Sequence, residues 1–326
     1  MSILRGDVAA VCRRMLQEDR AGVAIHEKPD VDAVGACAGM LDAFRQLGVQ
    51  AALYVDRDVV VPLAEYLLGD SAAIVRGIPD VDTTLYVVDS GTRARVALAL
   101  DGWTGSVVNI DHHGDNDGFG DLVLLRPETS SASEIVCEID RALGLVPSPQ
   151  AARALFAGIS FDTGHFRHTS TSAATFAQAA WLREIGVDVT DVYRRLYESR
   201  SPAALRLWAR AIGAARTVGN GAALIATLTQ ADFAATGATD EDTEGIVDAL
   251  RAVDGVNVAG VIKEQATGSR VRVSLRADAL DVRAIAALRG GGGHRLAAGF
   301  SSDESPGEVE AWLSSELAKR LSTASS

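Results

Sequence analysis

The sequence has few cysteines, no long apolar run and a shortage of positive charge, and each absence argues against a class of protein. Its three cysteines, Cys12, Cys37 and Cys137, are widely spaced and lie outside any CxxC motif, so we expect neither a disulfide framework nor a zinc ribbon. No apolar run approaches the roughly 18 residues of a membrane-spanning helix. The N-terminal stretch mixes charged with aliphatic residues, unlike a signal peptide. These features predict a cytoplasmic protein with no membrane partner.

The shortage of positive charge limits the nucleic acids that the protein can bind. Lys and Arg number 31 against 43 Asp and Glu, which gives a formal net charge of -12. Sequence-independent affinity for DNA or RNA comes mainly from cationic side chains that neutralise phosphates. We therefore expect no long nucleic acid as partner. A small phosphate-bearing ligand remains compatible, because a bound divalent metal lets a carboxylate-rich site hold phosphate.

The chain of 326 residues suits two domains. In its first part, short aliphatic runs alternate with helical patterns, which is typical of a parallel α/β sheet. The predicted fold class is α/β, with an N-terminal domain whose parallel sheet is flanked by helices, a helical connector and a smaller C-terminal α/β domain. The N-terminal elements are strands at 21–25, 49–55, 84–88 and 106–110, a helix at 32–47, and helical regions at 130–144 and 148–196.

The domain boundaries follow from this pattern. We place the N-terminal domain at 1–190, the connector at 191–215 and the C-terminal domain at 216–326. The connector includes an amphipathic helix expected at 201–215. The expected C-terminal elements are strands at 222–228, 256–263 and 270–276 and helices at 239–253, 281–288 and 306–321.

Four apolar segments of the N-terminal domain each end in carboxylates or imidazoles. Since ligands of open parallel sheets bind outside the carboxyl ends of the strands, we expect these side chains to converge. Converging carboxylates repel each other unless a cation lies among them. Oxygen and imidazole ligands without thiolates suit Mg²⁺ or Mn²⁺, and their number favours two ions roughly 3.5 to 4 Å apart. The residues concerned are His26, Asp30, Asp32, Asp89, Asp111, His112, His113 and Asp162.

Each of these residues alone has a purely structural interpretation. A lone aspartate at a strand end is most often a helix N-cap or a turn former, which applies to Asp32, Asp89 and Asp162 taken singly. The distribution of histidine argues otherwise, because all six histidines fall inside or beside a few polar turns, which favours a metal or phosphate site. They are His26, His112, His113, His165, His168 and His294.

A run of four glycines, 290–293, is the main feature of the C-terminal domain. Such a run is usually a flexible loop. Here His294 follows it, and Arg276 ends the strand expected at 270–276. Glycines let backbone N–H groups approach an anion closely, and the two side chains would add charged donors. We therefore expect a substrate clamp in the second domain.

The motifs resemble, in order and over most of the chain, those of the DHH phosphoesterases. Within that family they resemble the hydrolases of short oligoribonucleotides that also act on adenosine 3′,5′-bisphosphate (pAp). The position after Gly164 is His165, where a small residue such as serine would be expected. The matching pieces are His26-x-x-x-Asp30-x-Asp32, Val88-Asp89-Ser90, Asp111-His112-His113, Phe161-Asp162-Thr163-Gly164, Val273-Ser274-Leu275-Arg276 and Gly290-Gly291-Gly292-Gly293-His294.

The resemblance implies a role for each matching residue. Asp89 would bridge two Mn²⁺ ions, with Mg²⁺ as the alternative metal. His113 would contact the scissile phosphate, and Asp111 would orient its loop. The implied ligands are His26, Asp30 and Asp89 for one ion and Asp32, Asp89, His112 and Asp162 for the other, and the implied substrate-binding residues are Ser274, Arg276, Gly291, Gly292, Gly293 and His294.

The activity that the resemblance implies is two-metal-dependent hydrolysis of short oligoribonucleotides, about two to five nucleotides long and including pApA, to 5′-mononucleotides, together with dephosphorylation of pAp. A cyclic-dinucleotide phosphodiesterase and a RecJ-like exonuclease are alternatives, although the latter would usually carry a further nucleic-acid-binding module. A non-catalytic nucleotide sensor is a third, disfavoured because no expected ligand is missing. Short RNA and pAp are thus the expected partners, and a homodimer the expected assembly.

Overall fold

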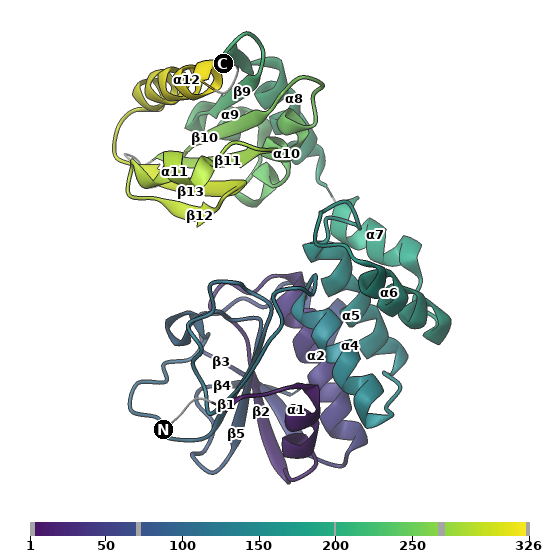
Figure 1. The fold of residues 1–326 in the computed structure, drawn as a ribbon. Helices are drawn as coiled ribbons and strands as arrows, with labels where there is room; N and C mark the ends of the chain where they lie inside the picture. The colour runs from purple at the N-terminus through teal and green to yellow at the C-terminus, as the bar shows by residue number, and fades with distance from the viewer. Residues whose placement is uncertain (1–3, 70–72, 199, 267–270, 324–326) are drawn as a thin grey trace. The chain divides into compact units, whose positions relative to one another are not determined.

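The computed structural model describes residues 4–69, 73–198, 200–266 and 271–323, and its chain divides into two compact units, Met1–Glu198 and Ser199–Ser326 (Figure 1). Each unit has its own sheet and its own hydrophobic core. The segment 191–215 is divided between them, because helix α7 (Val189–Tyr197) belongs to the first unit and α8 (Pro202–Gly213) to the second. Within the described ranges, no helix combines the length and the apolarity needed to cross a membrane.

The first unit is built on a seven-stranded sheet in the order β1-β7-β6-β5-β2-β3-β4. Every pairing in it is parallel, which confirms the predicted α/β class. The sequence analysis missed three of its strands because they have only two to four residues, too few for a clear pattern. The strands are β1 (Leu4–Arg5), β2 (Arg20–Ala24), β3 (Gln50–Val55), β4 (Ile74–Arg76), β5 (Thr84–Val88), β6 (Val107–Asp111) and β7 (Leu122–Leu125).

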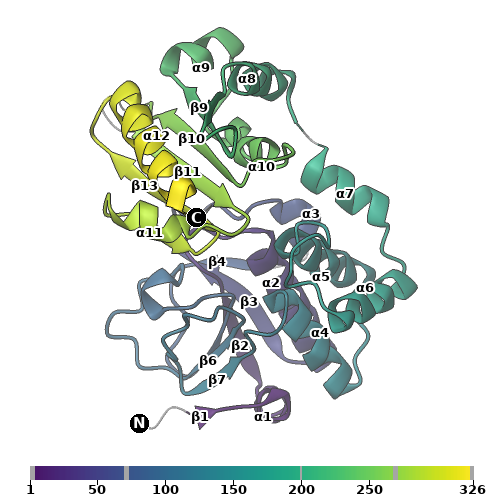
Figure 2. The same ribbon diagram turned by 45° about the horizontal axis from the view of Figure 1, so that its top comes forward.

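Helices α1 (Val8–Met15), α2 (Val31–Gln46) and α4 (Ala132–Leu143) pack on one face of this sheet (Figures 1 and 2). Helix α5 lies against α2 and α4, and the short 3₁₀ helix η1 (Arg93–Arg95) and the chain after it cover the opposite face. Strand residues alternate between the two faces, as in any pleated strand. The remaining helices of the unit are α3 (Ala64–Leu68), α5 (Pro149–Asp162), α6 (Ala173–Ile185) and α7.

The apolar segment 154–161, which precedes Asp162, is part of helix α5, in agreement with the helical region predicted at 148–196. Pro149 occupies the first turn, and the hydroxyl of Ser148 accepts a hydrogen bond from the amide of Ala151, two features that favour a helix start at this point. Asp162 is therefore delivered by the last turn of a helix, whereas the other ligand candidates follow strands or begin α2.

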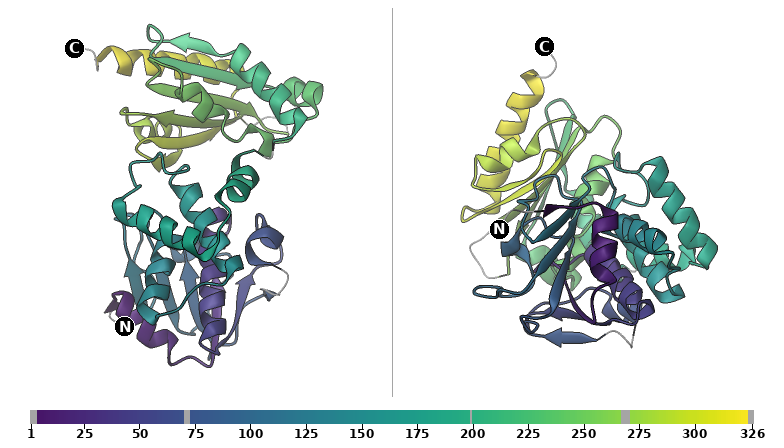
Figure 3. Two further views of the ribbon diagram at one scale, coloured as in Figure 1. Left: turned by 90° about the vertical axis from the view of Figure 1, so that its right-hand side faces the viewer. Right: turned by 60° about the horizontal axis from the view of Figure 1, so that its bottom comes forward.

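The second unit has a mixed six-stranded sheet in the order β12-β13-β11-β10-β9-β8. Helices α8 and α10 cover β9 and β10 on one face, and α11 and α12 pack on the other; Figure 3 shows α12 in yellow along this sheet. The elements are β8 (Arg216–Val218), β9 (Ala223–Leu228), α9 (Gln230–Thr236), η2 (Glu241–Thr243), α10 (Ile246–Arg251), β10 (Val258–Glu264), β11 (Val271–Ala277), α11 (Val282–Ala287), β12 (Gly292–His294), β13 (Ala297–Ser302) and α12 (Pro306–Thr323).

Two expectations for this unit differ from the structure. The helix expected at 239–253 is broken into η2 and α10, because Gly245 adopts a positive φ of 84° between them. The glycine run is not only a loop, since β12 pairs with β13 in an antiparallel hairpin. Residue 270, where a strand was expected to begin, lies outside the described residues.

Candidate functional site

The first histidine and aspartate of the site come from the turn between β2 and α2. Asp30 is the N-cap of α2, and its Oδ1 accepts hydrogen bonds of 3.0 Å from the amides of Asp32 and Ala33. Its Oδ2 lies 4.0 Å from Nε2 of the buried His26. Asp30 therefore caps α2 with one oxygen and leaves the other facing an imidazole, whereas Asp32, which was considered as a cap, lies in the first turn of the helix.

Asp32 is fully buried and joins two helices. Its Oδ2 accepts a 2.7 Å hydrogen bond from the amide of Ala132, and its Oδ1 accepts one of 3.0 Å from Ser133, both in the first turn of α4. A helix N-terminus with its free N–H groups and positive dipole end stabilises a carboxylate. Gly158 of α5 makes this approach possible, because a Cβ there would lie 2.6 Å from Oδ1 of Asp32.

Asp89 is the centre of the cluster. It follows β5, has a positive φ of 56° and is 2% exposed. Three imidazoles approach its carboxylate, Nε2 of His26 at 3.6 Å, Nε2 of His112 at 3.4 Å and Nδ1 of His113 at 3.6 Å. One carboxylate thus connects the polar ends of β2, β5 and β6.

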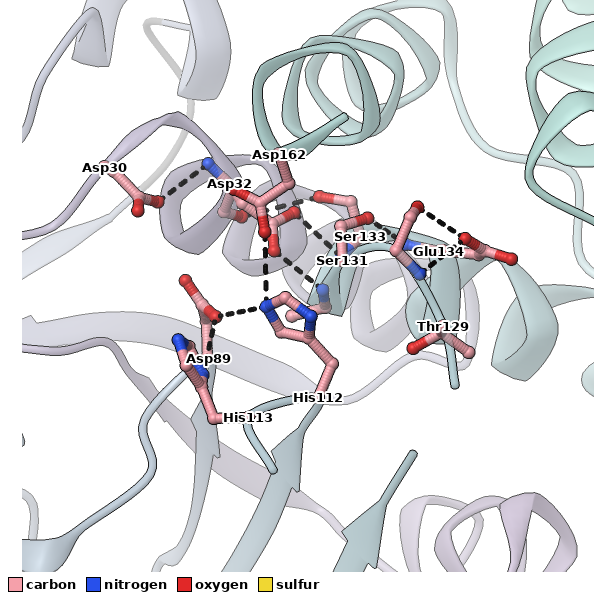
Figure 4. Close-up of polar contacts among 12 residues, drawn as sticks. Asp30, Asp32, Asp89, His112, His113, Thr129, Ser131, Ser133, Glu134 and Asp162 are labelled. Carbon is pink, nitrogen blue, oxygen red and sulfur yellow. Dashed lines mark hydrogen bonds and ion pairs between the residues drawn. The ribbon is translucent and has the colours of Figure 1, made fainter. Parts of the chain in front are cut away.

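His112 connects Asp89 to Asp162, as Figure 4 shows. Its Nε2 lies 3.2 Å from Oδ2 of Asp162 at the end of α5. Three overlapping groups therefore have ligand atoms within 4.8 Å of one another, and they share Asp89 or His112. They are Asp89, His112 and His113; His26, Asp30 and Asp89; and Asp32, His112 and Asp162. Together they contain every residue that the sequence analysis expected to bind metal.

The polar atoms of this cluster are better suited to coordinate a cation than to form hydrogen bonds with one another. Among the described residues, Oδ1 of Asp89 is buried without a hydrogen-bond partner, an arrangement that is costly unless something else satisfies this atom. Four carboxylates and three imidazoles without a thiolate suit an oxygen- and nitrogen-preferring divalent ion. The chain therefore has a His and Asp metal-binding site in its first unit.

The pKa values of the cluster also indicate that its buried carboxylates require a balancing positive charge. Burial, with the charges of Asp89 and Asp162, raises the pKa of Asp30 to about 6. Burial lowers the pKa of His112, but the contacts with Asp162 and Asp89 outweigh it and raise that pKa to about 12. Burial raises the pKa of Asp89, but the contacts with His112 and His26 outweigh it and hold that pKa below its usual range. Without a cation, protons on imidazoles balance the carboxylates.

His113 is held by a second set of contacts. Its Nδ1 lies 2.8 Å from Oδ1 of the fully buried Asp111, and this bond is the main reason that the pKa of His113 is raised. Asn116 donates to Oδ2 of Asp111 at 2.6 Å and to Oδ1 of Asn109 at 2.9 Å. Asp111 thus fixes the ring of His113 through Nδ1, as second-layer carboxylates do for catalytic and ligating histidines.

Four of the six substrate-binding residues expected in the second unit share one face of its sheet, whereas Gly293 occupies the alternate position, paired with Ala298, and Gly291 precedes β12. Register pairs Arg276 of β11 and His294 of β12 with the same residue of β13, Ala297. Ser274 and Gly292 are likewise both paired with Gly299. Since side chains on directly paired positions point to the same side, these residues form one strip. The neighbouring Val273 and Leu275 point to the buried face.

The sequence analysis missed the residues that support the ligands. Asn109 and Asn116 flank the two histidines in N-I-D-H-H-G-D-N. The amide of Asn116 could have been recognised as a partner for Asp111, and Asn109 as a partner for Asn116. The first turn of α4 was visible only as a helix start, with Ser131 as its N-cap. Nothing local in the sequence indicates that this turn meets Asp32, which lies 100 residues earlier than Ala132.

Comparisons with known proteins agree with this geometry. Residues 21–159 match the DHH family, N-terminal domain, and residues 220–322 match the DHHA1 domain. A protein of Streptococcus mutans described as a probable bifunctional oligoribonuclease and PAP phosphatase is 33% identical over 85% of this chain and 87% of its own. The chain belongs to the DHH family. The resemblance found in the motifs is therefore confirmed, and the chain is a phosphoesterase of this family.

Two further likenesses cover nearly the same span. A bifunctional oligoribonuclease and PAP phosphatase of Thermus thermophilus is 29% identical over 85% of this chain and 82% of its own. The crystal structure of an exopolyphosphatase-related protein from Bacteroides fragilis superposes with a TM-score of 0.86 over 97% of each chain, at 20% identity. The structural likeness supports the fold of the DHH phosphoesterase.

Metal binding by this cluster should be linked to proton release. Ligands must be deprotonated to bind a cation, so Mn²⁺ at pH 7 should displace protons from the imidazoles that now balance the carboxylates. Affinity should also fall as the pH drops through about 6, where Asp30 gains a proton. Calorimetric titration with Mn²⁺ in two pH 7 buffers of different ionisation enthalpy measures the release. Equal heats in the two buffers would contradict this account.

Proposed function

We propose that this chain is a two-metal, Mn²⁺-dependent phosphoesterase that hydrolyses short oligoribonucleotides, including pApA, to 5′-mononucleotides and dephosphorylates pAp. The observation that carries the proposal is the overlap of ligand groups at Asp89 and His112, which suits two neighbouring cations. The substrate class is supported by two relatives, 33% and 29% identical, whose descriptions name both activities.

The proposed assignment of ligands follows the overlapping groups. His26 and Asp30 would hold one ion with Asp89, and Asp32, His112 and Asp162 would hold the other, with Asp89 shared. Divalent cations held by these residues would lower the pKa of a bound water and offset the negative charge of a phosphate ester. Asp32 enters this arrangement already fixed by the amides of α4, so its orientation needs no further adjustment.

His113 is proposed to act on the phosphate itself. With Nδ1 bonded to Asp111, its Nε2 remains to donate a hydrogen bond or a proton to a phosphate oxygen or to the leaving oxygen. Its raised pKa favours the protonated ring that this role needs. Asp111 and Asn116 would keep the ring in one orientation through the reaction, which limits the reorganisation that catalysis must overcome.

The strip of the second unit is proposed to bind the terminal nucleotide or phosphate. Arg276 contributes a guanidinium whose Nε lies 3.5 Å from Oδ1 of Asp248. At this distance Asp248 can orient the guanidinium without forming a tight ion pair with it. Gly292 has no atom within 4 Å of the place where a Cβ would stand, and it has no positive φ. Neither packing nor backbone conformation requires glycine there, so close approach of a ligand to the backbone is the reason we assign to it. Gly291, Gly293, Ser274 and His294 complete the proposed group.

Short substrates fit the charge of the chain as well as the relatives. A chain with a net charge of -12 has no sequence-independent affinity for a long polyanion such as RNA. Binding must therefore depend on the bound cations and on a few fixed groups, which serve one or two nucleotides at a time. The homodimer and the cytoplasmic location expected from the sequence stay predictions.

A length series tests the proposal. Wild type and Asp89→Ala are given pAp, pApA, a five-mer and a 24-mer RNA, with Mn²⁺ and with chelator, and mononucleotide release is measured. We expect metal-dependent turnover of the shortest substrates by wild type, and a loss of at least about a hundredfold in Asp89→Ala because both ions lose a ligand. If folded, metal-bound wild type hydrolysed none of these substrates, the proposal would fail and a nucleotide sensor would become the better account.

Two arginines on the same strand offer a matched pair of variants for the second unit. Arg276→Ala should raise KM for pApA by roughly tenfold or more with little change in kcat, because a lost charge-assisted hydrogen bond removes that much binding. Arg272, exposed and four residues earlier on β11, is the control, and Arg272→Ala should behave as wild type. Equal effects of the two substitutions would remove Arg276 from the substrate site.

A further inference from the structure

The turn after Asp162 has a strained backbone. Gly164, His165 and Phe166 are consecutive residues with positive φ, at 54°, 59° and 62°. Residues with side chains rarely adopt this conformation, and when they do the surrounding structure must hold them there. Here the amide of Phe166 donates to Oγ1 of Thr163 at 2.9 Å, and the amide of His165 donates to the carbonyl of Ser160 at 2.6 Å.

The strained turn places His165 in a row of rings that we call the aromatic ladder. Neighbouring ring centroids along it are 5.4, 5.6, 4.7 and 5.2 Å apart. The gathering is notable in a chain of which only 5% is aromatic. In order, the aromatic ladder consists of Phe176, Phe166, His165, Tyr193 and Tyr197, from α6, the turn and α7.

His165 itself is held firmly although it lies outside the core. Its Nδ1 is 3.1 Å from Oγ of Ser160, and its ring leans on Tyr193 at an interplanar angle of 60°. The hydroxyl of Tyr197 donates to the carbonyl of Ser160 at 2.8 Å, which ties α7 to the same turn. His165 remains partly exposed. Its ring is fixed by the contacts with Ser160 and Tyr193.

The ladder adjoins the metal-binding cluster. Asp162 is three residues before His165, and Nδ1 of His168, on the same turn, lies 3.0 Å from the carbonyl of Asp162. Burial is the main reason that the pKa of Tyr197 is raised, but the charge of Asp162 also contributes. Tyr197, at one end of the aromatic ladder, therefore lies within electrostatic range of the carboxylate that contacts His112. A nucleotide whose phosphate lay among those ligands would carry its sugar and base past this turn.

We propose that a nucleobase of the substrate stacks on His165, whose ring Ser160 and Tyr193 hold in position. The inference rests on the proposed function, because it needs a nucleotide ester at the metal centre. Every base has a π face, so such a contact supplies affinity without selecting the base. The strained turn is compatible with this role, since it holds a flat, partly exposed side chain three residues after Asp162, a candidate ligand of the metal site. His165 is thus a substrate-positioning residue that distinguishes nucleotide esters from phosphates without a base.

The test uses two variants that separate the ring from the fold of the turn. His165→Asn removes the ring but keeps a residue that tolerates positive φ and can still bond Ser160. His165→Phe keeps an aromatic face and loses the contact with Ser160. Steady-state kinetics of the full chain with Mn²⁺ are measured on pApA and on two abasic analogues, each lacking one base. Thermal unfolding and Mn²⁺ affinity are measured alongside for each variant.

We expect His165→Asn to raise KM for pApA by roughly tenfold with little change in kcat, as loss of one stacked base should do. The same substitution should leave one abasic analogue nearly unchanged, because that analogue lacks the stacking base, while the other behaves as pApA. His165→Phe should stay within about threefold of wild type on pApA.

Three other outcomes overturn the inference, in distinguishable ways. If His165→Asn has no effect on pApA, the ring binds nothing. If it slows both abasic analogues as much as pApA, or if His165→Phe is equally impaired, the residue only shapes the turn. If wild type itself hydrolyses neither pApA nor the analogues, the proposed function fails and the inference fails with it.

Discussion

Mutual repulsion among buried carboxylates is the constraint on which the first unit depends. Asp30, Asp32, Asp89 and Asp162 converge from β2, α2, β5 and α5 with few cationic side chains among them. Such a group is stable only if protons or metal ions supply positive charge. His112 and His113, whose pKa values are raised by their carboxylate partners, supply positive charge when no cation is bound, whereas the imidazoles of the proposed ligand set are those of His26 and His112. The site thus has two balanced charge states.

The fold prepares this site before any ion arrives. Parallel strands bring His26, Asp89 and His112 to one edge of the sheet, as the order β6-β5-β2 requires. The amides of α4 fix Asp32, and glycine at position 158 leaves room for its carboxylate. Helix geometry, packing and electrostatics therefore act on the same residue. Because each support comes from a different segment, the site cannot form unless the whole unit folds.

Much of this could be predicted from the sequence, and what could not depends on tertiary packing. The strand ends were recognisable because short apolar runs stop at Asp89 and at Asp111. Asp162 was found by its apolar run, but a run of that length does not distinguish strand from helix. The support of Asp32 by α4 joins segments 100 residues apart, and the aromatic ladder joins residues 165, 176 and 193 only because α6 and α7 return to the turn. The hairpin at Gly292 was hidden by its lack of side chains.

The central claim is that Asp89 is shared by two metal ions, and electron paramagnetic resonance of the Mn²⁺-loaded chain tests it directly. Wild type with two equivalents of Mn²⁺ should give the spectrum of an exchange-coupled pair, because a bridging carboxylate and a short separation couple the two spins. Asp89→Asn should lose that coupled signal while remaining folded. A wild-type spectrum of isolated Mn²⁺ ions, with two ions bound, would contradict the shared role of Asp89.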